Sequence, residues 1–536
     1  MRTVILIAFA ALADAAAVRR NEETPAASST INPYFQTTPE LFAGPTATGE
    51  APFLAQTNSL PPTGVSYIPP YPLETQIPIA DNPQDENIFQ SMGLLSPYYS
   101  TPEGHGVDEY PLPPGSNISQ LHMLHRHGAR YPGASSGVTK FGQKMMKLKG
   151  TFKATGALSF LNDWTYKLGK EILVPVGRQQ LFDSGIAHYY QYGHLYNTST
   201  NIVVRSTTQD RMRNSAEYFL AGFFGQDWTR NASLELLVEA NGFNNTMTGW
   251  DNCPMSDLGP SLGGFNASDA WEAVYLQNAT ARLAALIEGY NWTLSDTYNA
   301  QSLCPYETVG LGYSKFCDLF TLEEWQAFEY NDALNLAGNY GFQSPTGRAT
   351  AVGYVGELLG RLDHHLLTET YGQANITLDN NTATFPLNQS LYLDFSHDTN
   401  MFSILVAMGF KQFAPFLPED RLVLKRDFIV SHLVPFAGRF DIEIIKTPQP
   451  VPEDRSTDYI GGPPTTYIHF IVNQRTLSLG RSFPECGLRA DGWCELGTFI
   501  DIQKGSLKEA DFDFACFGNY PSLPYGSIKN GAPLRS

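Results

Sequence analysis

Three short apolar segments of the chain each run directly into polar or charged residues and are then followed by a helical pattern. They span residues 118–124, 202–204 and 391–395, and they lead into RHGARYP, RST and SHDTN respectively. Short apolar runs of this kind predict buried strands, and strand-then-helix units predict a mostly parallel sheet. Ligands bind such sheets at the carboxyl ends of the strands. The sequence therefore predicts that the polar residues of all three segments lie at one edge of an α/β sheet.

The remaining pattern predicts how the 536 residues are organised. A Pro-, Ser- and Thr-rich stretch without hydrophobic period cannot bury a core, so we expect it to be extended or disordered. The long helical stretch between the strands predicts a helical insertion in a sheet domain. The expected parts are a signal peptide at 1–17, the Pro-rich lead at 18–87, an α/β domain at 88–225 and 346–520, the mainly helical insertion at 226–345, and a tail at 521–536.

The first residues indicate export. Arg2 precedes a short apolar run, and small residues follow at 13–17, as in a cleaved secretory signal. The run is much shorter than the ~20 residues that a membrane span needs, and we expect no membrane partner. Ten Asn-x-Ser/Thr sequons agree with a glycoprotein secreted to the extracellular space. They are Asn117, Asn197, Asn231, Asn244, Asn266, Asn278, Asn291, Asn375, Asn380 and Asn388.

The six cysteines suit an oxidising compartment, and none stands in the CxxC spacing of a zinc site. Six cysteines allow 15 pairings, so the sequence alone does not fix them. Proximity along the chain favours Cys304 with Cys317 and Cys486 with Cys494. Cys253 would then pair with Cys516.

The net charge of −18 restricts the possible partners. An acidic protein repels polyanions, so we expect no nucleic acid partner. A small phosphorylated substrate stays possible only where cations are concentrated locally. RHGARYP at 126–132 is such a place, because two arginines flank His127 on a turn that Gly128 lets approach a ligand closely. Arginine binds phosphate oxygens bidentately, and a histidine beside them can attack phosphorus. A basic turn that pairs with surface carboxylates is the structural alternative.

RHGARYP, together with SHDTN at 396–400, resembles the motifs of the histidine acid phosphatases, and in particular of the fungal acid phosphatases and phytases. The resemblance covers roughly residues 88–520 and includes VPVGRQQLFDSG, VVRSTTQDR, FCDLFTLEEW and VPFAGRFDIEII. It implies a phosphoglycerate-mutase-like α/β sheet flanked by helices. It also implies hydrolysis of phosphate monoesters at acidic pH through a phosphohistidine intermediate, without metal or cofactor, and makes inositol phosphates candidate substrates.

The resemblance assigns roles residue by residue. His127 matches the nucleophile and Asp398 the acid that protonates the leaving alcohol. The matching phosphate-binding residues are Arg126, Arg130, Arg205 and His397. These cations should lower the pKa values of His127 and Asp398, which predicts an acidic optimum.

Other residues have weaker signals. Lys140 is a candidate contact for a polyphosphorylated substrate, with a solvated lysine as the alternative. His122, His125 and His127 resemble a metal cluster in spacing, but 125 and 127 would share one face of a strand and 122 the other. Three further charged residues belong to no functional motif, and we expect them to be structural or solvent-facing: Arg211, Arg213 and Glu357.

The chain also departs from the fungal phytase pattern. It has no cysteine before Cys253, and GNYGFQSPTGR at 338–348 replaces a lysine-bearing loop, so strict phytate specificity is open. Two other classes stay open as well. One is a phosphohistidine mutase or related transferase, and the other is a secreted phosphate-ester-binding protein without catalysis. The sequence indicates nothing about oligomeric state.

Overall fold

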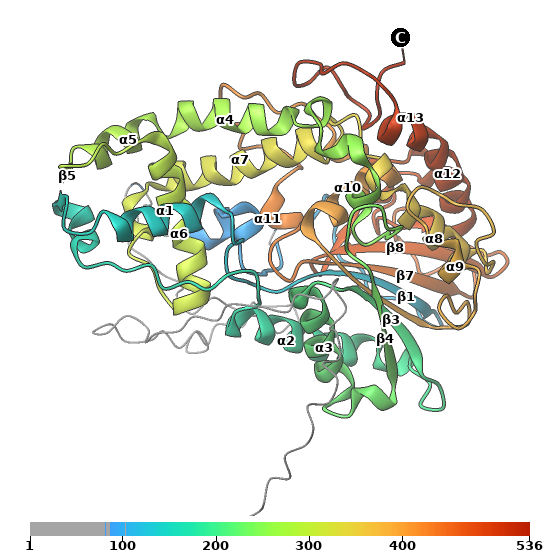
Figure 1. Ribbon diagram of the computed structural model, residues 1–536. Helices are drawn as coiled ribbons and strands as arrows, with labels where there is room; N and C mark the ends of the chain where they lie inside the picture. Colours follow the sequence, from blue (N-terminus) through green and yellow to red (C-terminus); the bar gives the residue numbers. More distant parts are fainter. Residues whose placement is uncertain (1–80, 82–85, 102, 536) are drawn as a thin grey trace, which may run out of the picture.

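The structure is a computed structural model that describes residues 81, 86–101 and 103–535. The expected signal peptide and nearly all of the expected lead lie outside the described residues. From residue 86 onward the chain forms a central sheet with helices on both faces and a helical region at one side (Figure 1).

The central sheet has eight strands in the order β10-β8-β7-β1-β6-β3-β4, and β9 pairs with β8. β1, β6, β3 and β4 are parallel, and β7, β8, β9 and β10 form an antiparallel extension beside β1. The strands are β1 (Asn117–Arg126), β3 (Ile202–Thr207), β4 (Ala232–Leu237), β6 (Leu391–Ser396), β7 (Arg439–Thr447), β8 (Thr465–Val472), β9 (Arg475–Leu477) and β10 (Cys494–Glu495).

Both faces of the sheet are covered, which explains why the strands are continuously apolar rather than alternating. Met123 of β1 packs into a core with Leu181 and Phe219, and the next residue, Leu124, packs into the opposite core with Leu405. Figure 1 shows α2 and α3 on one side of the sheet and α8, α10 and α12 on the other. These helices are α2 (Pro175–Tyr192), α3 (Asp210–Phe224), α8 (Val352–Leu362), α10 (Asp398–Met408) and α12 (Leu496–Glu509).

The helical region is formed by segments from two parts of the chain. Thr293 and Thr321 begin two of its helices as capping boxes with Asp296 and Glu324, so both helix starts are fixed locally. The strands β2 (Lys153–Ala154) and β5 (Ile287–Glu288) pair at its end. Its helices are α1 (Gly137–Lys147), α4 (Gly263–Tyr275), α5 (Gln277–Ala284), α6 (Leu294–Leu311) and α7 (Leu322–Asn339).

This arrangement differs from the expected division at two places. β4 lies inside the expected insertion at 226–345, yet it pairs with β3 as the edge of the central sheet. Its ASLELL sequence is only partly buried, as suits an edge strand, and carries no long apolar run. α1, from the expected sheet domain, instead packs against α6, and Phe141 and Leu303 belong to the same apolar core.

Covalent and polar contacts join distant parts of the chain. Disulfides join Cys304–Cys317 and Cys486–Cys494, the two pairs that proximity favours, and Cys253–Cys516, the pair that these leave. The expected tail is docked, because Arg348 donates from Nε to the Asn530 carbonyl at 2.7 Å. Among the helices that the structure describes, none has the length and apolar character needed to cross a membrane. Three short helices complete the fold: α9 (Ile376–Asp379), α11 (Val430–Leu433) and α13 (Phe512–Phe517).

The disulfides should differ in what they contribute to stability. Cys253–Cys516 closes a sequence separation of 263 residues, and Cys486–Cys494 closes one of 8. Because loop-closure entropy grows with loop length, replacing the first pair by serines should lower the free energy of unfolding by about 5 kcal/mol, and replacing the second by about 2.5 kcal/mol. Urea unfolding of the two double variants measures the difference, and equal losses would contradict it.

Candidate active site

The candidate site lies where β1 and β6 end side by side. The two strands are parallel, and Arg126 at the end of β1 is opposite Ser396 at the end of β6. The next residues, His127 and His397, are therefore neighbours, with ring centroids 5.7 Å apart. His397 is also the N-cap of α10, so the first turn of that helix faces the same place. Two motifs that are 270 residues apart thus meet because of strand register.

The loop after β1 is fixed against the start of α2. A Cβ at position 128 would collide with the Gly177 carbonyl, so the two backbones approach each other more closely than any other residue allows. Ala129 completes the attachment, because its N–H donates to Gln180 Oε1 at 2.8 Å and its carbonyl accepts from Val174 at 3.0 Å. The loop that carries His127 is therefore rigid.

His127 is buried, with 1% of its surface exposed. Its Nδ1 lies 2.9 Å from the Gly128 carbonyl oxygen, which can only accept, so Nδ1 carries the proton and Nε2 has a free lone pair. Burial lowers the pKa of His127 well below its usual value, and Arg126, Arg211 and Arg130 lower it further. The imidazole is therefore neutral and nucleophilic in mildly acidic solution.

Arg126 is held on three sides. Its Nη1 donates to the carbonyls of Leu94 at 2.6 Å and Val434 at 2.8 Å, and its Nη2 forms an ion pair with Asp398. Its guanidinium carbon lies 4.7 Å from the centre of the Phe436 ring. These contacts fix the guanidinium beside His127.

Arg130 and Arg211 complete the group of cations around His127. Arg211 lies in the first turn of α3, where its Nη1 donates to Glu171 at 3.1 Å. Burial lowers its pKa to about 10, with a further contribution from Arg130. The Nε atoms of Arg126, Arg130 and Arg211 are all buried and have no hydrogen-bond partner in the described part of the chain. The three arginines that lower the pKa of His127 therefore each keep one donor without a partner among the described residues, and an anion accepts hydrogen bonds from such donors.

Arg205, which the sequence suggested as a phosphate ligand, lies elsewhere. It donates to both oxygens of Asp394, at 2.8 and 2.9 Å, and its Nη1 lies 2.8 Å from Glu357. Arg361 donates to the same Asp394 at 2.8 Å. All three nitrogens of the Arg205 guanidinium are thus engaged by carboxylates inside the protein. Arg205 lies within β3, whereas Arg211 lies beyond the end of β3. Of these two arginines, Arg211 is the one that acts on His127.

His397 is oriented by Glu239, for which the sequence gave no signal. His397 Nε2 lies 3.1 Å from Glu239 Oε2, and the same carboxylate oxygen accepts from Thr207 at 2.6 Å. Burial would raise the pKa of Glu239, but His397 and nearby donors outweigh it, so the carboxylate is ionised. The Trp250 ring lies edge-on to His397 at 5.5 Å.

Asp398 is the first residue of α10, and 14% of its side chain is exposed. Burial would raise the pKa of Asp398, but Arg126, Arg130 and His397 lower it below its usual value. The N–H of Thr399 also donates to Asp398 Oδ1, at 2.7 Å. The carboxylate is therefore held at the mouth of the site by the cation that an incoming anion would also contact.

The remaining candidates lie outside this group. Lys140 is exposed on α1, and it is absent from the cations that act on His127. His125 contacts Ser184 Oγ at 2.8 Å, and His122 stacks on Tyr392 with ring centres 4.6 Å apart. The three histidines of the RHGARYP segment therefore point to different places. Within the described residues, no group of His, Cys, Asp and Glu side chains is arranged to hold a metal ion.

Comparison with known proteins identifies the family. Residues 117–473 match the model of the histidine phosphatase superfamily, branch 2. Phytase A of Aspergillus terreus is 32% identical over 375 residues, which cover 66% of this chain and 78% of the relative. Phytase A of Aspergillus oryzae is 30% identical over 374 residues, with the same shares covered.

Solved structures share the fold at low sequence identity. The phytase of D. castellii superposes with a TM-score of 0.63 at 22% identity, covering 83% of this chain and 91% of that one. A multiple inositol polyphosphate phosphatase of Bifidobacterium longum superposes with a TM-score of 0.50 at 13% identity, covering 76% and 96%. The expected α/β fold is thus confirmed. The chain belongs to branch 2 of the histidine phosphatase superfamily, in the line of the fungal phytases, and is a phosphate monoester hydrolase of the histidine acid phosphatase type.

Proposed function

We propose that the protein transfers the phosphoryl group of its substrate to His127 Nε2 and then to water. The observation that carries this proposal is the neutral, buried imidazole of His127, whose proton is on Nδ1. Three arginines act on it, and the Nε donor of each has no partner among the described residues. We assign Arg126, Arg130 and Arg211 to the equatorial phosphate oxygens, together with His397. Charge stabilisation of this kind, fixed before the reaction, supplies much of the catalysis in phosphoryl transfer.

The reaction then has two balanced steps. In the first, the Nε2 lone pair of His127 forms a bond to phosphorus, the ester P–O bond breaks, and Asp398 gives its proton to the leaving alkoxide. In the second, Asp398 accepts a proton from water, the oxygen of that water bonds to phosphorus, and the P–N bond breaks. Asp398 is placed for both proton transfers because it borders the cations and remains open to solvent.

The acid role of Asp398 implies an acidic optimum. In the free site its pKa is low, because Arg126 stabilises the carboxylate after burial is accounted for. A phosphate dianion that binds Arg126 offsets this cation and raises the pKa of Asp398 in the complex. The rate should therefore fall as pH rises through that pKa. The low pKa of His127 keeps the nucleophile neutral on the acidic side.

We further propose that inositol phosphates are among the substrates and that the protein is secreted. The first point is supported by the relatives that are named phytases. Three disulfides and the sequons of the sequence support the second point.

Replacing the nucleophile should abolish turnover without abolishing anion binding. We expect His127→Ala to lose about 10⁴-fold or more in kcat, because the nucleophile itself is removed. Rapid quenching of the wild type at alkaline pH, followed by mass spectrometry, should locate a phosphate on the peptide that contains His127. An unchanged rate in His127→Ala would exclude the assignment.

Asp398→Asn should separate substrates by leaving group. An amide cannot donate the proton, so alkyl phosphates, whose alkoxide is a poor leaving group, should react about 10²- to 10⁴-fold more slowly. p-Nitrophenyl phosphate should lose much less, because its phenolate leaves without protonation. The comparison is made on kcat for both substrates at pH 5, and equal losses would remove Asp398 from the acid role.

Arg205 and Arg211 should respond in opposite ways to the same substitution. Arg205→Met leaves Asp394 and Glu357 buried without their partner and should cost about 3–5 kcal/mol of folding free energy. Arg211→Met should instead raise KM about 10- to 100-fold with little change in melting temperature, because a charge-assisted phosphate contact is lost. Steady-state kinetics and thermal unfolding of the pair decide the assignment. A large KM increase in a stable Arg205→Met variant would reverse it.

A further inference from the structure

A single backbone residue joins a carboxyl group to Arg126. The N–H of Leu94 donates to Asp332 Oδ2 at 2.8 Å, and the carbonyl of the same residue accepts from Arg126 Nη1 at 2.6 Å. Asp332 lies on α7, and Leu94 lies in the short helix η3 (Gly93–Leu95). The position of the acceptor that orients Arg126 is therefore set in part by Asp332.

The residue before Leu94 is adapted to this contact. Gly93 has φ of +54°, and a Cβ there would collide with the carboxyl group of Asp332. Only glycine allows the backbone both that conformation and that approach. The carboxyl group thus lies directly on the peptide that it binds.

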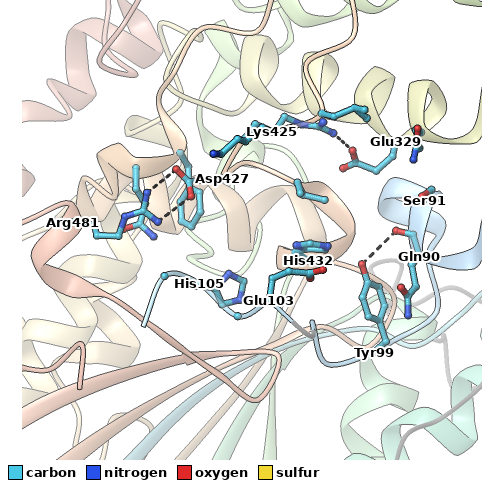
Figure 2. A pocket seen from close by; sticks show the side chains of 18 residues that line it. Gln90, Ser91, Tyr99, Glu103, His105, Glu329, Lys425, Asp427, His432 and Arg481 are labelled. Carbon is cyan, nitrogen blue, oxygen red and sulfur yellow. Dashed lines mark hydrogen bonds and ion pairs between the residues drawn. The ribbon is translucent and has the colours of Figure 1, made fainter. Parts of the chain in front are cut away.

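The segment that carries Leu94 is packed between two apolar cores, with Leu94 against one and Leu95 against the other. The preceding helix, η2 (Ile88–Ser91), borders a cavity of about 520 Å³ through Gln90 and Ser91. Figure 2 shows Gln90 and Ser91 on one wall of this cavity and Glu329 and His432 on others. η3 itself contacts α7, and the bond from the Leu94 N–H to Asp332 therefore helps to fix where the Leu94 carbonyl lies.

Asp332 also belongs to the electrostatic field of the active site. Burial raises its pKa to about 7, Asp398 raises it as well, and the Leu94 N–H and Arg126 lower it. Glu272 from α4 and Tyr298 from α6 face the same carboxyl group. Asp332 is therefore neutral in acid and adds a negative charge near Arg126 and Asp398 as pH rises through about 7.

We propose that Asp332 is a positioning residue that controls anion affinity: it orients Arg126 through Leu94, and its ionisation weakens binding of the phosphate group. The inference rests on the proposed function only for the identity of the anion site. In acid, the neutral carboxyl group of Asp332 does not compete with the substrate for the charge of Arg126. In neutral or alkaline solution, its carboxylate competes with the substrate for that charge.

Sulfate is a suitable probe, because it is a tetrahedral dianion whose charge is constant from pH 5.5 to 8.5. In Asp332→Asn the amide oxygen can still accept from Leu94, but the side chain stays neutral. We expect the variant and the wild type to bind sulfate equally at pH 5.5. At pH 8.5 the variant should bind about tenfold more tightly, because the wild type carries one more like charge near the anion. Isothermal titration calorimetry measures both, and equal affinities at both pH values would overturn the proposal.

A second variant tests the orientation of Arg126. Asp332→Ala removes the acceptor for Leu94 at every pH, so KM at pH 5.5 should rise about three- to tenfold, and Asp332→Asn should restore it. Glu307→Gln is the matched control. Glu307 is a buried carboxyl group whose pKa is also raised to about 7, but it binds Trp164 and Ser314 and should leave KM and sulfate affinity unchanged.

The outcomes separate this inference from the proposed function. An Asp332→Ala variant that binds substrate and sulfate as tightly as Asp332→Asn at pH 5.5 would overturn the role through Leu94. A protein that shows the expected pH dependence of sulfate binding but never forms phosphohistidine would support the role of Asp332 and contradict the proposed function instead. The calorimetric measurement does not depend on turnover, so the two results are independent.

Discussion

The structure depends on holding several cationic side chains together where water is largely excluded. Burial lowers the pKa values of Arg126 and Arg211, which shows that their charges are costly here without an anion. Each guanidinium is held by fixed acceptors, such as the Leu94 carbonyl for Arg126 and Glu171 for Arg211. The Nε donor of each has no partner in the part of the chain that the structure describes. A tetrahedral dianion bound beside these arginines would accept hydrogen bonds from such donors. The chain as a whole carries a net charge of −18 and repels anions. Recognition of a phosphorylated substrate therefore depends on these cations at the site.

A second group of charges lies beneath the first and has a different role. Arg205 and Arg361 share Asp394, and Arg205 also pairs with Glu357, so β3, β6 and α8 are joined by a closed set of ion pairs. Such buried pairs contribute little net stability compared with apolar packing, but breaking them is costly. They therefore fix the geometry of the two strands whose following residues, His397 and Arg211, must face one another. The catalytic arrangement is thus supported by a group that makes no contact with the anion.

The sequence predicts site residues well where a motif directly follows a strand. It predicts them less well where the exact end of a strand decides which residue reaches the site. RHGARYP and SHDTN each follow a strand directly, so His127 and Asp398 could be placed at the sheet edge without knowledge of the register. The end of β3 is less sharply marked, because VVRSTTQDR contains two arginines, and the strand extends past Arg205 to Thr207. Glu239 and Asp332 act only through residues distant in the chain. No local pattern distinguishes them from ordinary acidic residues, and only the folded structure indicates what they contact.

The two acidic residues near Arg126 show how contact distance decides the sign of a pKa shift. Asp398 pairs directly with the guanidinium, and this attraction, with that of Arg130 and His397, outweighs the cost of burial. Asp332 reaches Arg126 only through the backbone of Leu94, so for this residue burial dominates and the carboxyl group keeps its proton. An anion that neutralises Arg126 raises the proton affinity of both groups, since it removes the cation that each of them senses. Substrate binding and proton uptake are therefore coupled at this site. The coupling is strongest for Asp398, the group that must deliver its proton to the leaving alcohol.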